Sequence, residues 1–239
     1  VATSVSVGRR HSLVLSDSGT LMGFGGLEGR GMPVFAPVPS TRPHPDAATR
    51  VAAVASGAYF CVILTTAGHV HLLGNLLGTR TRAPLMHRRV ALESTTTGND
   101  SDDVSTVVVS AVAAGDRHAL LLTGDGRVFG LGATNGPWGQ ARRGEPSRAD
   151  AAAHEITGDR GALAGARGRV RAIAAGSAHS VALTTDGRLW AFGCDRDGQC
   201  GVAAGGPPVV ALPRLLASLV PTSAVAAGGT RTYALLGIP

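Results

Sequence analysis

The sequence contains no lysine, so all 22 basic side chains among its 239 residues are arginines. Arginine makes planar, bidentate contacts with phosphate, and the net charge of +6 favours acidic partners such as nucleic acid. A coding bias that raises Ala, Gly and Arg together would give the same composition. Composition alone therefore leaves both explanations open.

Cysteine, aromatic residues and long apolar runs are also scarce. The three cysteines, Cys61, Cys194 and Cys200, are too few for a disulfide framework, so we expect a reducing, intracellular setting. No apolar run approaches the roughly 18–20 residues of a membrane span, so we expect no membrane insertion. With only 4% aromatic residues, the core must consist mainly of Val, Leu, Ile and Ala.

Five copies of one glycine-containing unit organise the chain. The best-kept copy is 170–193, VRAIAAGSAHSVALTTDGRLWAFG, in which Asp-Gly separates two alternating runs and so predicts a β-hairpin. Each copy has an anchor glycine, at Gly8, Gly57, Gly115, Gly176 and Gly228. In the first four copies a turn glycine follows 11 residues later, at Gly19, Gly68, Gly126 and Gly187, and a closing glycine 17 residues later, at Gly25, Gly74, Gly132 and Gly193.

Each complete copy predicts three strands, with a fourth after the following loop, as at 208–212. Units of about 50 residues with three or four antiparallel strands are typical of propeller blades. We therefore expect one all-β propeller domain over 1–239, with four full repeats, one partial repeat, and long inserts at 27–50, 79–108 and 133–169. Repeated proline excludes a long helix or a central strand from the first insert. The third insert could form a short helix at 148–156.

The repeat resembles that of the regulator of chromosome condensation family. Between Ala174 and Gly201 it reads AAG, HS, LT-x-DG, WAFG and DGQ-x-G, and Gly198, Gln199 and Gly201 match the family's GQ-x-G loop. The resemblance implies a β-propeller, which has seven blades in most members of the family. Phe60 replaces the repeat histidine in the second copy and Arg231 replaces it in the fifth.

Several side chains invite a catalytic or metal-binding interpretation. His11, His118 and His179 occupy one repeat position, and we interpret them as structural groups bonded to the backbone of a neighbouring blade. His69 and His71 have a metal-like spacing but no third ligand nearby, and Cys194 and Cys200 lack a second pair. The aspartates beside the hairpin glycines, Asp17, Asp125 and Asp186, are turn residues. The sequence thus predicts no catalytic residue, no cofactor site and no metal site.

Two arginine-rich inserts are the candidate contact surface for RNA or a protein partner. The candidate residues are Arg80, Arg82, His87, Arg88 and Arg89 in one insert and Arg142, Arg143 and Arg148 in the other. These side chains could neutralise several phosphates and give salt-dependent binding. The first group could instead form a solvated loop that folds back on the acidic tract 93–103.

We therefore expect a non-enzymatic scaffold that contacts proteins, and RNA through its basic loops, within a larger intracellular complex. Its charge and the absence of a starting Met favour a mitochondrial ribonucleoprotein over a nuclear or cytoplasmic host. The alternative, from the resemblance, is guanine-nucleotide exchange on a small GTPase. The acidic and histidine residues that this activity requires cannot be placed on matching loops of this sequence.

Overall fold

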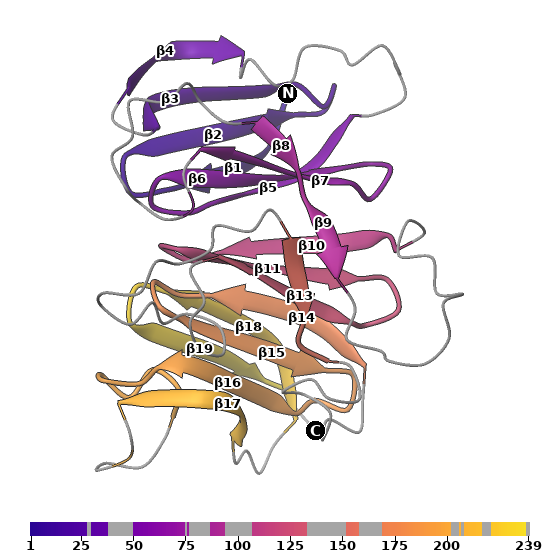
Figure 1. Cartoon of the computed structure of the whole chain (residues 1–239), viewed down its shortest axis with the longest axis vertical. Coiled ribbons are helices and arrows are strands. Elements are labelled where there is room, and N and C mark those ends of the chain that lie inside the picture. Colours follow the sequence, from indigo (N-terminus) through magenta and orange to yellow (C-terminus); the bar gives the residue numbers. More distant parts are fainter. Residues whose placement is uncertain are drawn as a thin grey trace.

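The computed structural model describes residues 1–27, 30–37, 50–74, 76, 87–93, 107–132, 152–157, 169–201, 206, 208–216 and 221–237. Every regular element in these ranges is a β-strand, and the strands form five sheets that follow one another in chain order (Figure 1). In the described part of the chain no helix is long and apolar enough to cross a membrane.

Three of the sheets are simple four-stranded meanders. The first contains β1 (Ala2–Val7), β2 (His11–Ser16), β3 (Leu21–Leu27) and β4 (Arg30–Pro37). The second contains β5 (Val51–Ser56), β6 (Phe60–Thr65), β7 (Val70–Gly74) and β8 (His87–Arg89). The fourth contains β14 (Val170–Ala175), β15 (His179–Thr184), β16 (Leu189–Cys194) and β17 (Val209–Leu216).

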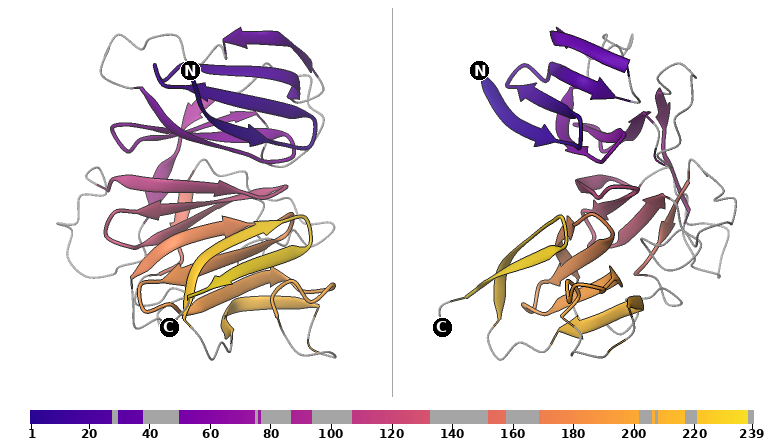
Figure 2. Two further views of the ribbon diagram at one scale, coloured as in Figure 1. Left: turned by 180° about the vertical axis from the view of Figure 1, so that it is seen from behind. Right: turned by 90° about the vertical axis from the view of Figure 1, so that its left-hand side faces the viewer.

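The third and fifth sheets depart from this plan. The third contains β10 (Val109–Ala114), β11 (His118–Thr123), β12 (Val128–Gly132) and β13 (Ala152–Glu155), followed by β9 (Ala91–Glu93), which pairs parallel to β13. The fifth contains only β18 (Thr222–Gly228) and β19 (Arg231–Leu236). In the side view of Figure 2 the sheets follow an arc, with β1 and the β18–β19 hairpin at its two ends.

The repeated glycines fix one register in all four complete sheets. The first residue of each second strand lies opposite the closing glycine of the third strand, as His179 lies opposite Gly193. The closing glycines have positive φ, and a Cβ on Gly25 would lie 2.4 Å from the backbone oxygen of Arg10. Only glycine fits this close approach without strain, which explains why the 17-residue spacing is kept.

Apolar side chains fill the space between successive sheets. Phe60, Phe129 and Phe192 are fully buried, and they belong to the second, third and fourth sheets respectively. Between the fourth and fifth sheets, Val225 and Ala227 of β18 pack against the cluster that contains Val181 and Leu183. Stacking buries one face of a sheet against the next, so most of the stability must come from contacts between blades.

The strands β8 and β9 join the second and third sheets at their outer edge. They are separated by one buried residue, Val90, and β8 pairs with β7 while β9 pairs with β13. Figure 1 shows the segment running from one sheet to the next. A single stretch of seven residues thus ties two blades together.

The inserts contain more regular structure than the sequence predicted. Residues 30–37 form β4, an edge strand, where proline is tolerated because one side of the strand needs no N–H donor. The possible helix at 148–156 is wrong for its described part, because 152–155 pair with β12 and β9 as β13. Pairing with distant strands has overridden the helical preference of its alanines.

Candidate interaction surface

The loops that join the first and second strand of each sheet form a row that runs along the arc, with one loop from each of the five sheets. These anchor loops are 8–10, 57–59, 115–117, 176–178 and 229–230. Backbone hydrogen bonds connect them from blade to blade: the Ala58 N–H donates to the Asp116 carbonyl at 3.3 Å, Asp116 to Ser177 at 3.0 Å, and Ser177 to Gly229 at 2.8 Å. The row therefore has a fixed backbone through the last four blades.

The side chains carried by this row of loops differ from blade to blade. The second residue after each anchor glycine is Arg10, Tyr59, Arg117, Ala178 and Thr230 in turn. Arg10, Arg117 and Thr230 are exposed, and Tyr59 and Ala178 are partly exposed. The row is thus a platform of constant shape whose chemistry is basic and aromatic in the first three blades and small or polar in the last two.

The repeat histidines lie beneath this row, at the contacts between blades. The Nε2 atom of His118 is 3.0 Å from the Ser180 hydroxyl of the next sheet, and His179 Nε2 is 2.9 Å from the Thr232 hydroxyl. His118 is 3% exposed and His179 is fully buried. The pKa of His118 falls to about 4 because burial disfavours the imidazolium, and burial also lowers the pKa of His179.

The histidine of the first sheet lacks this hydrogen bond. His11 is 3% exposed, and neither of its ring nitrogens has a hydrogen-bond partner among the described residues. The residue of the second sheet at the Ser180 position is Cys61, whose buried thiol has its pKa raised to about 12. Burial lowers the pKa of His11 to about 4. A weakly polar thiol has replaced the hydroxyl here.

The GQ-x-G loop of the fourth blade joins the same polar network. The Thr232 hydroxyl donates to the Gln199 carbonyl at 2.8 Å, so His179 Nε2 must donate to Thr232. Within the loop, Asp195 accepts a hydrogen bond from the Cys200 N–H at 2.7 Å. This loop is therefore a structural connector between the fourth and fifth blades.

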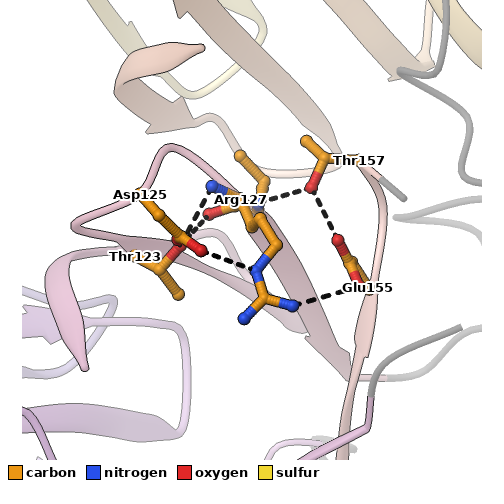
Figure 3. A network of polar contacts seen from close by, with 6 residues as sticks. Thr123, Asp125, Arg127, Glu155 and Thr157 are labelled. Atoms are coloured by element: carbon orange, nitrogen blue, oxygen red, sulfur yellow. Dashed lines mark hydrogen bonds and ion pairs between the residues drawn. The ribbon is translucent and has the colours of Figure 1, made fainter. Parts of the chain in front are cut away.

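A second polar cluster lies around the β11–β12 turn (Figure 3). Arg127 lies 3.0 Å from Asp125 and 3.8 Å from Glu155, whose side chain is only 1% exposed. Asp125 also accepts a hydrogen bond from Thr123, and Thr157 donates one to Glu155 at 3.2 Å. Burial raises the Asp125 pKa, but the hydrogen bonds from Thr123 and the backbone and the Arg127 charge together outweigh it, so the pKa is lowered. The cluster holds β13 on the third sheet.

The structure places few of the sequence-predicted contact residues. Arg80, Arg82, Arg142, Arg143 and Arg148 lie outside the described residues. His87, Arg88 and Arg89 form β8, so this part of the insert is a strand rather than a flexible loop; their side chains are not described. Arg10, Tyr59 and Arg117 were missed, although their shared offset from the anchor glycine could have identified them.

Other sequence-predicted positions have structural surroundings. Asp125 and Asp186 lie in hairpin turns and accept hydrogen bonds from Thr123 and Thr184. The Cys200 thiol donates to the Cys194 carbonyl at 3.3 Å. Across the described ranges no three His, Cys, Asp or Glu side chains gather in a way that could hold a metal ion.

Sequence comparisons identify the repeat. Two models described as the regulator of chromosome condensation (RCC1) repeat match residues 2–29, 109–135 and 170–199, and residues 186–235, which together make up about half of the chain. The chain is 31% identical over 156 residues to the E3 ubiquitin-protein ligase HERC2 of Homo sapiens, covering 64% of this chain and 3% of that protein. It is 36% identical over 93 residues to the regulator of chromosome condensation of Mus musculus, covering 39% of this chain and 20% of that protein.

Solved structures show the same architecture. Human WBSCR16 superposes with a TM-score of 0.73 at 21% identity, and Prp20p from Saccharomyces cerevisiae with 0.70 at 20%. These comparisons cover 98% and 99% of this chain but 57% and 56% of those chains, so the chain spans little more than half the length of the solved propellers it matches. The shared repeats and the shared sheet arrangement show that the chain belongs to the regulator of chromosome condensation repeat family of β-propellers.

Proposed function

We propose that this chain is a non-enzymatic propeller scaffold that binds other proteins through its anchor-loop row, as a subunit or assembly factor of a larger intracellular complex. The observation that carries the proposal is the contrast between the backbone and the side chains of that row. The anchor loops of the last four blades are hydrogen-bonded in succession, whereas the side chains that the row exposes change from Arg10 to Thr230. A rigid platform with variable side chains suits binding, because little conformational entropy is lost on association.

The remaining polar groups of the repeat support a binding role over a catalytic one. The histidines that could act as acids or bases are buried between blades, and two of them are hydrogen-bonded to hydroxyl groups of the next blade. A general base must reach a substrate proton, and these imidazoles are not exposed to one.

An acidic partner fits the exposed arginines of the row. Arg10 and Arg117 flank Tyr59, and this combination suits a phosphate-rich or carboxylate-rich surface. RNA is the acidic partner we propose, with a mitochondrial ribonucleoprotein as the host complex, and the net charge of +6 supports this extension. The solved relative Prp20p is described with binding properties to Gsp1p and histones, which supports protein binding by a propeller of this kind.

Affinity purification of the tagged chain tests the proposal. We expect a partner in stoichiometric amount, and we expect the double variant Arg10→Ala/Arg117→Ala to lose it. The matched control is Arg50→Ala/Arg188→Ala, which removes the same charge from exposed positions away from the anchor loops. Recovery of the chain as a free monomer, or equal loss of the partner in both double variants, would overturn the proposal.

RNA binding and nucleotide exchange have their own tests. If the basic insert binds RNA, the change of Arg80, Arg82, Arg88 and Arg89 to Ala should weaken association and reduce its dependence on salt. Unchanged RNA binding would reduce this block of arginines to a solvated loop. Accelerated nucleotide release from a small GTPase by the purified chain would instead favour the exchange-factor alternative.

A further inference from the structure

We propose that the basic end of the anchor-loop row binds a single-stranded segment of RNA, with one unpaired base stacked on the ring of Tyr59. Arg10 and Arg117, on the blades before and after Tyr59, contact the phosphates on either side of that base. The assignment rests on the proposed function, because it concerns the same row, and it adds a binding mode in which each side chain has a separate role.

The anchor loops of neighbouring blades lie in direct contact along the whole row. A Cβ on Gly8 would lie 2.4 Å from the Gly57 carbonyl oxygen, and a Cβ on Gly57 would lie 2.7 Å from that of Gly115. For Gly115 and Gly176 the corresponding distances, to the Gly176 and Gly229 carbonyl oxygens, are 2.3 Å and 2.9 Å. Side chains at one offset from these glycines therefore stand on adjoining loops, and this holds for the first blade as well as for the last four.

The first three anchor loops are basic, and the last two carry no charge. Residues 8–10, 57–59 and 115–117 read GRR, GAY and GDR, so three arginines and one aspartate give these loops a net charge of +2. Residues 176–178 and 229–230 read GSA and GT. Arginine contacts phosphate oxygens with its planar fork, so the first three blades are the part of the row that favours a polyanion.

Tyr59 is the aromatic residue of the five anchor loops, and its loop lies between those of the two exposed arginines. It is partly exposed, whereas the next residue, Phe60, is fully buried. The Phe60 ring packs against Gly57, where a Cβ would lie 2.1 Å from it, so the loop is held from below while the tyrosine stays at the surface. A base stacks on such a ring whatever its identity, because every base has a π-face.

A single strand of RNA fits these side chains better than a duplex or an acidic protein segment does. In a duplex the bases stack on one another, so their faces are not available to Tyr59. Glutamate and aspartate side chains would pair with the arginines, but they present no ring to the tyrosine. An unpaired nucleotide supplies both a phosphate and a π-face, and it therefore matches both kinds of side chain.

Asp116 is the acidic residue of these three loops, and its charge opposes a phosphate beside Arg117. The Asp116 side chain is partly exposed, and its N–H donates to the Ser177 carbonyl at 3.0 Å. Asp116→Asn removes the charge and keeps the shape of the side chain. We expect this variant to bind RNA about twofold more tightly or better at low salt.

Fluorescence anisotropy with the purified whole chain and a labelled oligouridylate of about eight nucleotides tests the assignment. We expect saturable binding at low salt and weaker binding of an RNA hairpin. Tyr59→Ala should weaken binding by about tenfold or more and leave the slope of log affinity against log salt unchanged, because a stacking contact is lost. Arg10→Ala should weaken binding and also reduce that slope by about 0.7, because a phosphate contact is lost.

Two variants serve as matched controls for Tyr59→Ala. Tyr59→Phe keeps the ring in place, and Tyr233→Ala removes the chain's other tyrosine, which is 58% exposed on β19 and lies outside the anchor loops. Both should bind the oligonucleotide as the unmodified chain does. Circular dichroism of each variant checks that its β-structure is retained.

Four results would overturn the assignment. They are no binding by a folded chain, equal effects of Tyr59→Ala and Tyr233→Ala, a hairpin bound as tightly as the single strand, and polyglutamate that competes as well as the oligouridylate. The last result would identify an acidic protein segment as the partner.

The outcome for the scaffold function can be read separately. If one of these four results is found while the tagged chain still recovers a partner through Arg10 and Arg117, the scaffold function stands and the RNA assignment alone is wrong. A free monomer that binds the oligonucleotide at Tyr59 would instead keep the RNA site and remove the larger complex.

Discussion

Replacing Ser180 by alanine would remove a buried hydrogen bond between the third and fourth blades. The Ser180 hydroxyl is fully buried and lies 3.0 Å from Nε2 of His118. Water does not reach this site, so the imidazole nitrogen gains no new partner. A buried polar group left unsatisfied costs about 1–3 kcal/mol, and we expect the free energy of unfolding to fall by that amount.

The chain contains an apolar version of the same contact. One interface earlier, the equivalent positions are Phe60 and Ala119, both fully buried and in the same hydrophobic cluster. The double variant His118→Phe/Ser180→Ala copies this pair. It should be more stable than Ser180→Ala alone, because neither side of the contact then carries an unpaired polar group.

Urea unfolding followed by tryptophan fluorescence measures these differences, since Trp190 lies in the fourth sheet. His118→Phe alone should be destabilising, because it leaves the Ser180 hydroxyl unpaired beside a ring. The coupling energy of the cycle should be about 1 kcal/mol or more. If Ser180→Ala leaves the free energy of unfolding unchanged, or if the two single effects simply add, the contact between blades does not work as described.

Three further predictions follow from the same contacts. Cys61→Ser should be more stable than Cys61→Ala, by thermal unfolding, because a hydroxyl can satisfy His11; equal stability would contradict this. The pKa of His11 and His118 is about 4 in the folded chain against 6.5 unfolded, so protons bind the unfolded state preferentially between these values. The contribution of these histidines to the free energy of unfolding should therefore be fully present above about pH 6.5 and should be lost as the pH falls towards 4. The loss should be at most about 1.4 kcal/mol per pH unit for each histidine. A urea midpoint that stays constant over this pH range would refute this prediction. Arg127→Ala should lower the free energy of unfolding by about 1 kcal/mol more than Arg188→Ala does. The reason is that Arg127 lies beside the buried Glu155, whereas Arg188 pairs with the partly exposed Asp186. Equal urea midpoints for the two variants would argue against a stabilising role of Arg127.

The predictable part of the fold is the part that local chemistry controls. Asp-Gly turns and closing glycines require particular backbone angles, so the spacing of Gly187 and Gly193 predicted the β15–β16 hairpin and its register. The fourth strand of the fourth sheet was predicted at 208–212 and is found as β17 (Val209–Leu216), whereas β13 was harder to predict because it pairs with β12 across a long insert. The alanine-containing sequence of β13 favours a helix, but in the folded chain this segment forms a strand because β12 and β9 pair with it.

The candidate surface shows the same division. The sequence predicted a contact surface at the arginines of the inserts, because a cluster of like charges can be recognised along the chain. Arg10, Tyr59 and Arg117 are far apart in the sequence and lie in one row only because the blades stack; between the second and third anchor loops the Ala58 N–H donates to the Asp116 carbonyl. Their shared offset from the anchor glycine shows that they occupy equivalent positions, but their proximity arises from the stacking of blades.

The sequence by itself determined the family, the hairpins and their register, because the angles that glycine permits are a local property of the backbone. The sequence predicted structural roles for the repeat histidines, and tertiary structure decided which groups they contact. His118 and His179 became contacts between blades once stacking removed water from them and brought a hydroxyl within reach. Burial and pairing depend on which segments meet in space, and that information is not local.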